Sequence, residues 1–138
     1  MNQHCQIDPA ALERLCRLGG DEFATRMIEL FGSFGAQKIG DARRALEVAN
    51  RPEVVKAMHS MKSSAGNVGA VEVQDLAARI EHLAAQSQCE SLEKLMEELE
   101  LSFKRTKLEL EKARGQGGRT TISLPMQSEI PNPKSETN

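Results

Sequence analysis

Residues 54–70 of the chain read VVKAMHSMKSSAGNVGA. An α-helix turns by about 100° per residue, so five apolar side chains of this stretch fall within roughly 80° of one another. They are Val54, Met58, Met61, Ala65 and Val68. A stripe this narrow is typical of a helix that packs one face into a bundle. His59 lies about 140° from Val54 around the same helix, and its imidazole is therefore predicted to project away from the core.

The helix surface around His59 carries unusually small residues. Lys62, Ser63 and Gly66 follow it by three, four and seven residues and therefore lie beside it. A glycine inside a helix costs about 1 kcal/mol relative to alanine, and this cost is tolerated more readily where the backbone of another molecule must come close. We expect Ser63 and Gly66 to lie where a partner docks, together with Val55, an apolar residue near the His59 side.

The residues before this helix predict two helical regions. Asp8-Pro9 is typical of a helix start, and Gly19-Gly20 is expected to end the short helix that follows. A second helical region spans about residues 21–48. Its first apolar stripe consists of Phe23, Met27, Leu30 and Phe31. Glycines at positions 32, 35 and 40 leave open whether this region is two helices or one bent helix.

The helix that carries His59 is expected to begin within residues 50–53 and to end near Gly69. The next helix spans roughly residues 70–86. Ser87 and Glu90 then fit a capping box that opens the last helix. Apolar or small residues recur there every three or four positions, at Leu92, Leu95, Leu99, Phe103, Thr106 and Leu110.

Long amphipathic helices joined by short turns predict an all-α fold. The expected architecture is an antiparallel up-and-down four-helix bundle with a short extra N-terminal helix. From residue 115 onward the periodicity is lost and Gly, Pro, Ser and Thr become frequent. We therefore divide the chain into a helical domain, residues 1–114, and a flexible C-terminal tail, residues 115–138.

Composition excludes several classes of partner. The formal net charge of the 138 residues is −2, with acidic and basic residues interspersed, so neither nucleic acid nor a membrane surface is an expected partner. The N-terminal residues lack the pattern of a signal peptide. Three widely spaced cysteines, Cys5, Cys16 and Cys89, fit reduced thiols of a cytoplasmic protein, and the latter two are expected to be small buried side chains. The expected state is a monomer.

The residue types around His59 suit phosphoryl transfer. Imidazole is a good nucleophile near neutral pH, because the unperturbed pKa of histidine is near 6.5. A phosphorylated imidazole also needs its negative charge offset, and the ammonium group of Lys62 supplies a positive charge one helical turn away. The small neighbours leave room for an incoming group.

At these residues the chain resembles the histidine-containing phosphotransfer family, known as HPt. The signature of that family is a mid-helix His, Lys at plus three, small residues at plus four to plus six, and Gly near plus ten. The matching residues are His59, Lys62, Ser63-Ser64-Ala65 and Gly69, and the resemblance in helix order and length covers residues 8–114. One departure is Ser63, where the family usually has Gly; we expect activity to survive, with tighter docking geometry and a narrower choice of partner.

The resemblance implies a role in a phosphorelay of two-component signal transduction. His59 would accept a phosphoryl group, on Nε2, from a phospho-aspartate of a receiver domain and pass it to another receiver domain, with Lys62 near the phosphate. The implied partners are receiver domains of hybrid histidine kinases and of response regulators. Mg²⁺ would be bound by the receiver domain, and this chain would be a phosphocarrier that binds no cofactor and has no autokinase activity.

Other function classes fit the sequence less well. The alternative is a helical adaptor that binds signalling proteins and is never phosphorylated, although an adaptor has no need for the combination of His59, Lys62 and Gly66. A hydrolase using His59 and Ser63 is disfavoured, because no acidic residue lies one turn away on that face and a helix interior has no free N–H groups for an oxyanion hole. No metal-binding spacing and no nucleotide-binding loop is present.

Overall fold

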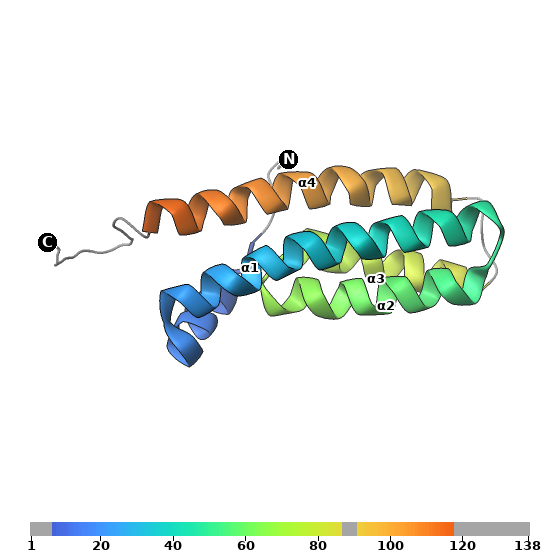
Figure 1. Ribbon diagram of the computed structural model, residues 1–138. Coiled ribbons are helices and arrows are strands. Elements are labelled where there is room, and N and C mark those ends of the chain that lie inside the picture. Colours follow the sequence, from blue (N-terminus) through green and yellow to red (C-terminus); the bar gives the residue numbers. More distant parts are fainter. Residues whose placement is uncertain (1–6, 87–90, 118–138) are drawn as a thin grey trace, which may run out of the picture.

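The structure of the protein is a computed structural model that describes residues 7–86 and 91–117, with side chains described up to residue 113. Within these ranges the chain forms four helices and no strand. They are α1 (Pro9–Glu47), α2 (Arg51–Asn67), α3 (Val71–Ala85) and α4 (Leu92–Gly117) (Figure 1). The β-type contact in the described residues is an isolated bridge between Ile7 and Ala70.

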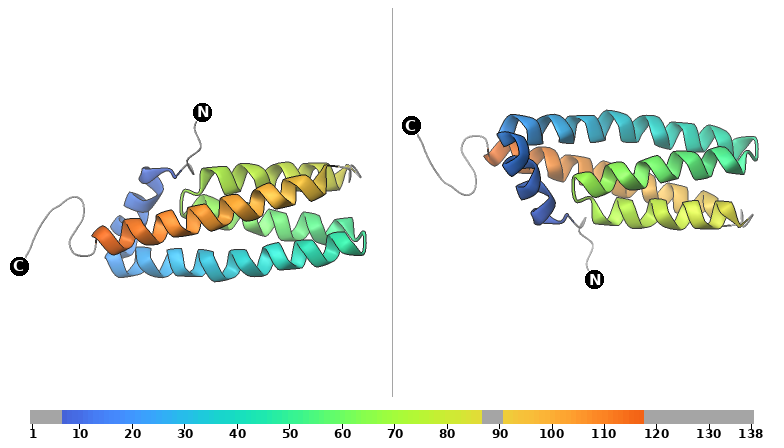
Figure 2. Two further views of the ribbon diagram at one scale, coloured as in Figure 1. Left: turned by 90° about the horizontal axis from the view of Figure 1, so that it is seen from above. Right: turned by 90° about the horizontal axis from the view of Figure 1, so that it is seen from below.

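The N-terminal segment of α1 is a separate short helix that meets the long one at a sharp bend. Gly20 has a φ of 84° and a ψ of −177°, which is not helical, and Figure 2 shows the preceding segment turned away from the bundle axis. At the start of α1 the Asp8 side chain accepts a hydrogen bond from the backbone N–H of Ala10 at 3.0 Å. The predicted start at Asp8-Pro9 and the predicted break at Gly19-Gly20 are therefore confirmed. Beyond this bend, α1 runs as a single continuous helix to Glu47 despite its further glycines.

The four helices pack as the predicted up-and-down bundle. Helices α1 and α3 each lie against α2 and α4 (Figures 1 and 2). The apolar stripe of α2 faces the interior, since Val54, Met58, Met61 and Ala65 are each 0 % exposed. The positions of α4 that were predicted to face inward are also buried. The sequence pattern therefore correctly identified the helix faces that form the core.

Two residues of the predicted stripe of α1 are not in the core. Phe31 is 1 % exposed, but Phe23 and Leu30 are 36 % and 52 % exposed. Figure 2 shows that this end of α1 extends beyond α2 and α3 and keeps α4 beside it. Fewer of its faces are therefore covered by other helices, and the prediction that Phe23 and Leu30 point inward is wrong.

One predicted boundary differs from the structure, and several other predictions concern residues outside the described ranges. Helix α4 continues to Gly117, so the predicted domain boundary at residue 115 falls in its last turn, where helix ends are hardest to place from sequence. The rest of the predicted tail, residues 118–138, lies outside the described residues, as do the capping box at residues 87–90 and two of the cysteines, Cys5 and Cys89. Cys16 is half-buried rather than fully buried, and its Sγ lies 3.6 Å from Asp21 Oδ1.

Gly35 of α1 is buried against side chains of α2 and α4. A Cβ at this position would be 2.4 Å from Phe103 Cε1 and 3.1 Å from Met61 Cε. Overpacking of this kind costs about 1–3 kcal/mol, whereas the higher helix propensity of alanine returns about 1 kcal/mol. We expect Gly35→Ala to lower the free energy of unfolding by up to about 2 kcal/mol in urea denaturation.

Gly40 provides the matched control, because a Cβ there would meet only the Arg44 side chain, at 3.5 Å. Gly40→Ala is expected to raise the free energy of unfolding by up to about 1 kcal/mol through helix propensity alone. Equal effects of the two substitutions would contradict the role assigned to Gly35 in close helix packing.

Candidate functional site

Helix α2, which carries His59, is held at both ends. At its start, the Asn50 side chain accepts a hydrogen bond from the backbone N–H of Glu53 at 3.3 Å. At its end, Gly69 has a φ of 75°, and a Cβ there would lie 2.7 Å from the backbone oxygen of Asp8, so glycine is required. The backbone N–H of Asp8 also donates to the Gly69 carbonyl at 2.8 Å. The N-terminal segment therefore fixes the end of the helix that presents the histidine.

His59 lies on the outer face of α2, opposite the buried apolar stripe. Its side chain is 65 % exposed, in agreement with the prediction from helical spacing. The imidazole is therefore open to a macromolecular partner while the backbone beneath it is rigidly packed.

A carboxylate from the neighbouring helix contacts both His59 and Lys62. Glu81 of α3 has its Oε2 at 3.1 Å from His59 Nδ1 and its Oε1 at 2.9 Å from Lys62 Nζ. The Glu81 side chain is only 20 % exposed. The three side chains form a polar cluster where α2 meets α3, and we call it the His59 cluster.

The charge state of Glu81 determines which nitrogen of His59 is free. Burial raises the pKa of Glu81, but the hydrogen bonds from Lys62 and His59 outweigh burial, so the net pKa lies below its ordinary value of 4.5. Glu81 is therefore ionised at neutral pH. An ionised carboxylate only accepts hydrogen bonds, so Nδ1 of His59 carries a proton, and in the neutral ring Nε2 is left with its lone pair. This arrangement leaves the lone pair of Nε2 available on the exposed imidazole.

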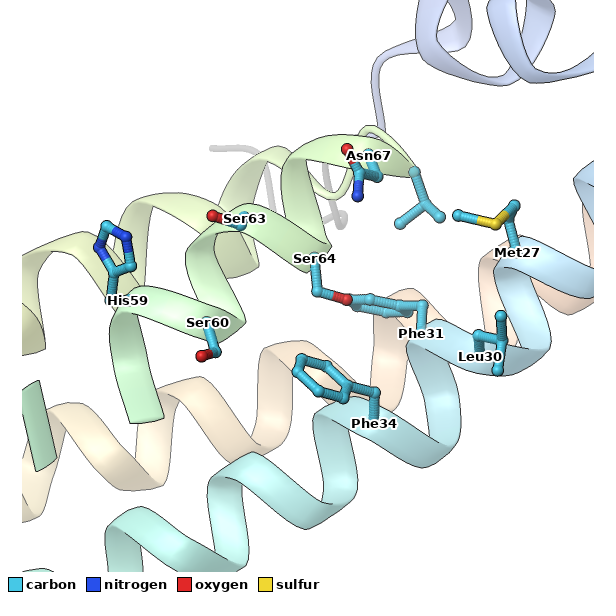
Figure 3. Close-up of a pocket in the computed structure, with 10 residues that line it drawn as sticks. Met27, Leu30, Phe31, Phe34, His59, Ser60, Ser63, Ser64 and Asn67 are labelled. Atoms are coloured by element: carbon cyan, nitrogen blue, oxygen red, sulfur yellow. The ribbon is translucent and has the colours of Figure 1, made fainter. Parts of the chain in front are cut away.

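An open cavity of about 480 Å³ lies beside His59, between α1 and α2. Figure 3 shows its two walls. The α2 wall is polar and consists of His59, Ser60, Ser63, Ser64 and Asn67, with Val68 at one end. The α1 wall is apolar and consists of Met27, Leu30, Phe31 and Phe34. Leu30 and Phe34 are 52 % and 36 % exposed, so the cavity offers apolar surface within reach of the histidine.

The two flanks of His59 therefore differ in chemistry. Around the helix axis, Lys62 lies about 60° to one side of His59 and Ser63 about 40° to the other. The Lys62 flank faces α3, where Glu81 pairs with the ammonium group. The Ser63 flank faces α1 and the cavity, which neither Lys62 nor Glu81 lines. One flank is ionic, and the cavity beside the other flank is lined on α2 by uncharged hydroxyl and amide groups next to His59.

The structure brings only one of the three predicted docking residues to this cavity. Ser63 lines it, whereas Val55 and Gly66 do not. Val55 is half-buried and packs against the core. A Cβ at Gly66 would lie 2.8 Å from Nε2 of Gln74 on α3, but this atom ends a flexible side chain that can move aside, so the contact does not by itself require glycine. Docking at Val55 and Gly66 stays a prediction.

Two features of the site were missed from sequence. Glu81 follows His59 by 22 positions on another helix, and only the pairing of α2 with α3 brings them together. The sequence analysis considered acidic residues only within one turn of His59 on its own helix, where none lies, and so did not find this carboxylate from α3. The exposed apolar wall formed by Leu30 and Phe34 was also missed, because both residues fit a helical apolar pattern that is normally buried.

Among the described residues, no three His, Cys, Asp or Glu side chains gather closely enough to hold a metal ion. Within the same ranges, the helices are too short or too polar to cross a lipid bilayer.

The fold and the exposed histidine agree with a match to a known family. Residues 26–115 match the family described as Hpt domain, which is well over half of the chain. The protein belongs to the Hpt domain family, and the resemblance noted from the sequence is confirmed. This family assignment supports a histidine phosphotransfer role in a two-component phosphorelay.

A solved structure supports the fold independently. The chain is similar to the crystal structure of histidine-containing phosphotransfer protein B (HptB) from Pseudomonas aeruginosa PAO1, with a TM-score of 0.76 and 20 % sequence identity. The similarity covers 80 % of this chain and 95 % of that one. No curated protein sequence matches the chain significantly.

Proposed function

We propose that His59 is the phospho-acceptor of this protein and takes a phosphoryl group from a receiver-domain aspartyl phosphate. In this step Nε2 attacks phosphorus, the P–O bond to the aspartyl oxygen breaks, and the aspartate leaves as a carboxylate. A second receiver domain then reverses the chemistry by attacking the phosphorus with its own aspartate, which breaks the N–P bond. The exposed imidazole with Nδ1 held by Glu81 is the observation that carries this proposal.

The His59 cluster supports this chemistry in two ways. Glu81 accepts a hydrogen bond from Nδ1–H and so favours the neutral tautomer in which Nε2 is unprotonated and free to attack. Lys62 supplies a positive charge one turn from the histidine, and its ammonium group swings on a flexible chain toward a phosphoryl group. Since Glu81 holds this ammonium in the unphosphorylated protein, Lys62 has to divide its contacts between Glu81 and the phosphoryl group after transfer.

The receiver domain would dock over the cavity between α1 and α2. The exposed side chains of Leu30 and Phe34 would contact apolar residues of the receiver domain. The short side chain of Ser63 lets the partner's aspartyl phosphate approach His59. We keep Val55 and Gly66 as proposed contacts on the opposite flank.

The receiver domains would belong to hybrid histidine kinases and to response regulators. We propose that each receiver domain binds the Mg²⁺ that transfer requires, that this chain acts as a monomer, and that it has no autokinase activity. Phosphoryl groups would then enter and leave only through receiver domains.

The alternative is an adaptor that binds receiver domains without being phosphorylated. The two are separated by mixing the purified protein with a receiver domain that carries labelled aspartyl phosphate. A phosphocarrier acquires a label that is acid-labile and base-stable, as expected for phosphohistidine. An adaptor binds the receiver domain but acquires no label.

Glu81→Ala tests whether the carboxylate sets the tautomer of His59. We expect label uptake to slow by about tenfold, less than the loss seen when a buried triad loses its carboxylate, because His59 is exposed. ¹⁵N NMR of the imidazole should show a larger share of the ring protonated on Nε2. Asp75→Ala is the control, since Asp75 is an exposed carboxylate on α3 with no hydrogen bond or ion pair among the described residues. An unchanged tautomer ratio in Glu81→Ala would contradict this role.

The pH dependence follows from the lowered pKa of Glu81. A carboxyl group whose pKa is lower in the folded than in the unfolded protein stabilises the folded state. This stabilisation is complete at pH values above the unfolded pKa, and it is lost as the pH falls through the lower, folded pKa. The contact with His59 should therefore persist at pH values where a free glutamate is already partly protonated.

A further inference from the structure

Three serine hydroxyls on the α2 wall of the cavity have no hydrogen-bond partner among the described residues. Ser60, Ser63 and Ser64 line the cavity beside His59, and none of them makes a hydrogen bond within residues 7–86 and 91–117. Two serines elsewhere in the bundle behave differently: Ser33 donates to backbone carbonyls of its own helix, and Ser102 donates to Glu72 at 2.9 Å. The cavity thus contains hydroxyl donors that nothing in the described chain uses.

Of these three serines, Ser63 is the one placed to reach a group bound to His59. Ser63 lies about 40° from His59 around the helix, whereas Ser60 and Ser64 lie about 100° and 140° away. Side chains of a helix lean toward its N-terminus, so a residue at plus four extends over the residue one turn before it. In Figure 3 the hydroxyl of Ser63 points toward His59.

The ring orientation of His59 places a phosphoryl group away from Glu81. Nδ1 faces Glu81 of α3 at 3.1 Å, and Nε2 lies across the imidazole ring from Nδ1. A phosphoryl group on Nε2 is therefore carried away from α3. In the unphosphorylated protein Lys62 contacts Glu81 on the α3 flank at 2.9 Å. On the opposite flank, the residues of α2 other than His59 that line the cavity are uncharged, and Lys56, about 60° from His59 on that side, precedes it by three residues and extends toward the N-terminus of the helix.

We infer that the Ser63 hydroxyl donates a hydrogen bond to a phosphoryl oxygen of phosphorylated His59. This inference rests on the proposed function, because it requires a phosphoryl group on Nε2. A hydroxyl is far too weak an acid to protonate the ring nitrogen and so promote loss of the group. Ser63 stands where the Hpt family usually has glycine, so this chain would have a phosphate contact that glycine does not provide.

The hydrogen bond should slow spontaneous loss of the phosphoryl group. The three phosphoryl oxygens are most negative in phosphohistidine itself, before the N–P bond loosens toward a metaphosphate-like transition state. A donor to these oxygens therefore stabilises the starting state more than the transition state. Removing the donor should make the phosphorylated form shorter-lived.

The test uses phosphoramidate, a small-molecule phosphoryl donor that needs no receiver domain. His59 Nε2 attacks its phosphorus, the P–N bond of phosphoramidate breaks, and ammonia leaves. The full-length wild type, Ser63→Ala, Ser63→Gly and His59→Gln are treated, freed of phosphoramidate, and followed by loss of the phosphohistidine signal in ³¹P NMR. Ser33→Ala is the matched control, because its hydroxyl already bonds the backbone of α1.

We expect the half-life of phosphorylated His59 to be shortened by about three- to tenfold in both Ser63→Ala and Ser63→Gly, and to be unchanged in Ser33→Ala. The melting temperature of Ser63→Ala should not fall below that of the wild type, since the Ser63 hydroxyl makes no hydrogen bond to the described residues in the unphosphorylated protein and alanine has the higher helix propensity. Equal half-lives for wild type and Ser63→Ala would overturn the inference and leave the phosphorylation of His59 standing. Failure of the wild type to take up any phosphoryl group on His59 would overturn the proposed function and this inference with it.

Discussion

His59→Gln is expected to abolish phosphoryl uptake from a labelled receiver domain. The rate of uptake should fall by more than about a thousandfold, as in enzymes that lose their nucleophile. Glutamine has no atom of comparable nucleophilicity, yet its amide can still donate a hydrogen bond to Glu81. The His59 side chain is 65 % exposed, so the substitution leaves no cavity in the core. Thermal unfolding followed by circular dichroism should therefore be unchanged, while label transfer falls to background.

His82 provides the matched control for this result. It is an exposed histidine on α3, and the described structure gives its side chain no partner. His82→Gln should take up label at the wild-type rate. Label uptake by His59→Gln, or its loss in His82→Gln, would show that the acceptor has been assigned to the wrong residue.

Lys62→Ala is expected to slow transfer, or shorten the life of the phosphorylated protein, by about tenfold or more. The substitution removes the positive charge nearest to the phosphoryl group. It also removes the 2.9 Å partner of Glu81, so that His59 alone faces a carboxylate that is only 20 % exposed. Single-turnover transfer from a labelled receiver domain measures both the rate and the subsequent decay.

Lys56→Ala separates this specific effect from the loss of any positive charge near the site. Lys56 precedes His59 by three residues, is exposed, and forms no ion pair with the described residues. Since helix side chains lean toward the N-terminus, it extends away from His59. We expect near wild-type transfer for Lys56→Ala, and an equal loss in both variants would argue against a distinct role for Lys62.

Much of the fold was predictable because local sequence determines it. The apolar stripe of α2 was predictable from helical spacing, since Val54, Met58 and Met61 lie on the same face of the helix. The break at Gly20 and the end of α2 at Gly69 were also readable, because both positions require a positive φ that favours glycine. The exposure of His59 followed from its angle relative to the stripe.

The features that escaped prediction depend on which helices are neighbours. Glu81 joins the His59 cluster only because α3 packs beside α2. Leu30 fits an apolar helical pattern but is exposed, because α1 extends past the end of α2 and α3 (Figure 2). Helical periodicity describes one helix at a time, and these features are properties of pairs of helices.

The central claim is that Nε2 of His59 becomes phosphorylated, and ¹⁵N and ³¹P NMR of histidine-labelled protein tests it most directly. The protein would be phosphorylated by a receiver domain and its three histidines assigned by single His→Gln variants. We predict phosphorus–nitrogen coupling at Nε2 of His59 and unshifted signals from His4 and His82. Coupling at Nδ1, or at either of the other two histidines, would contradict the account.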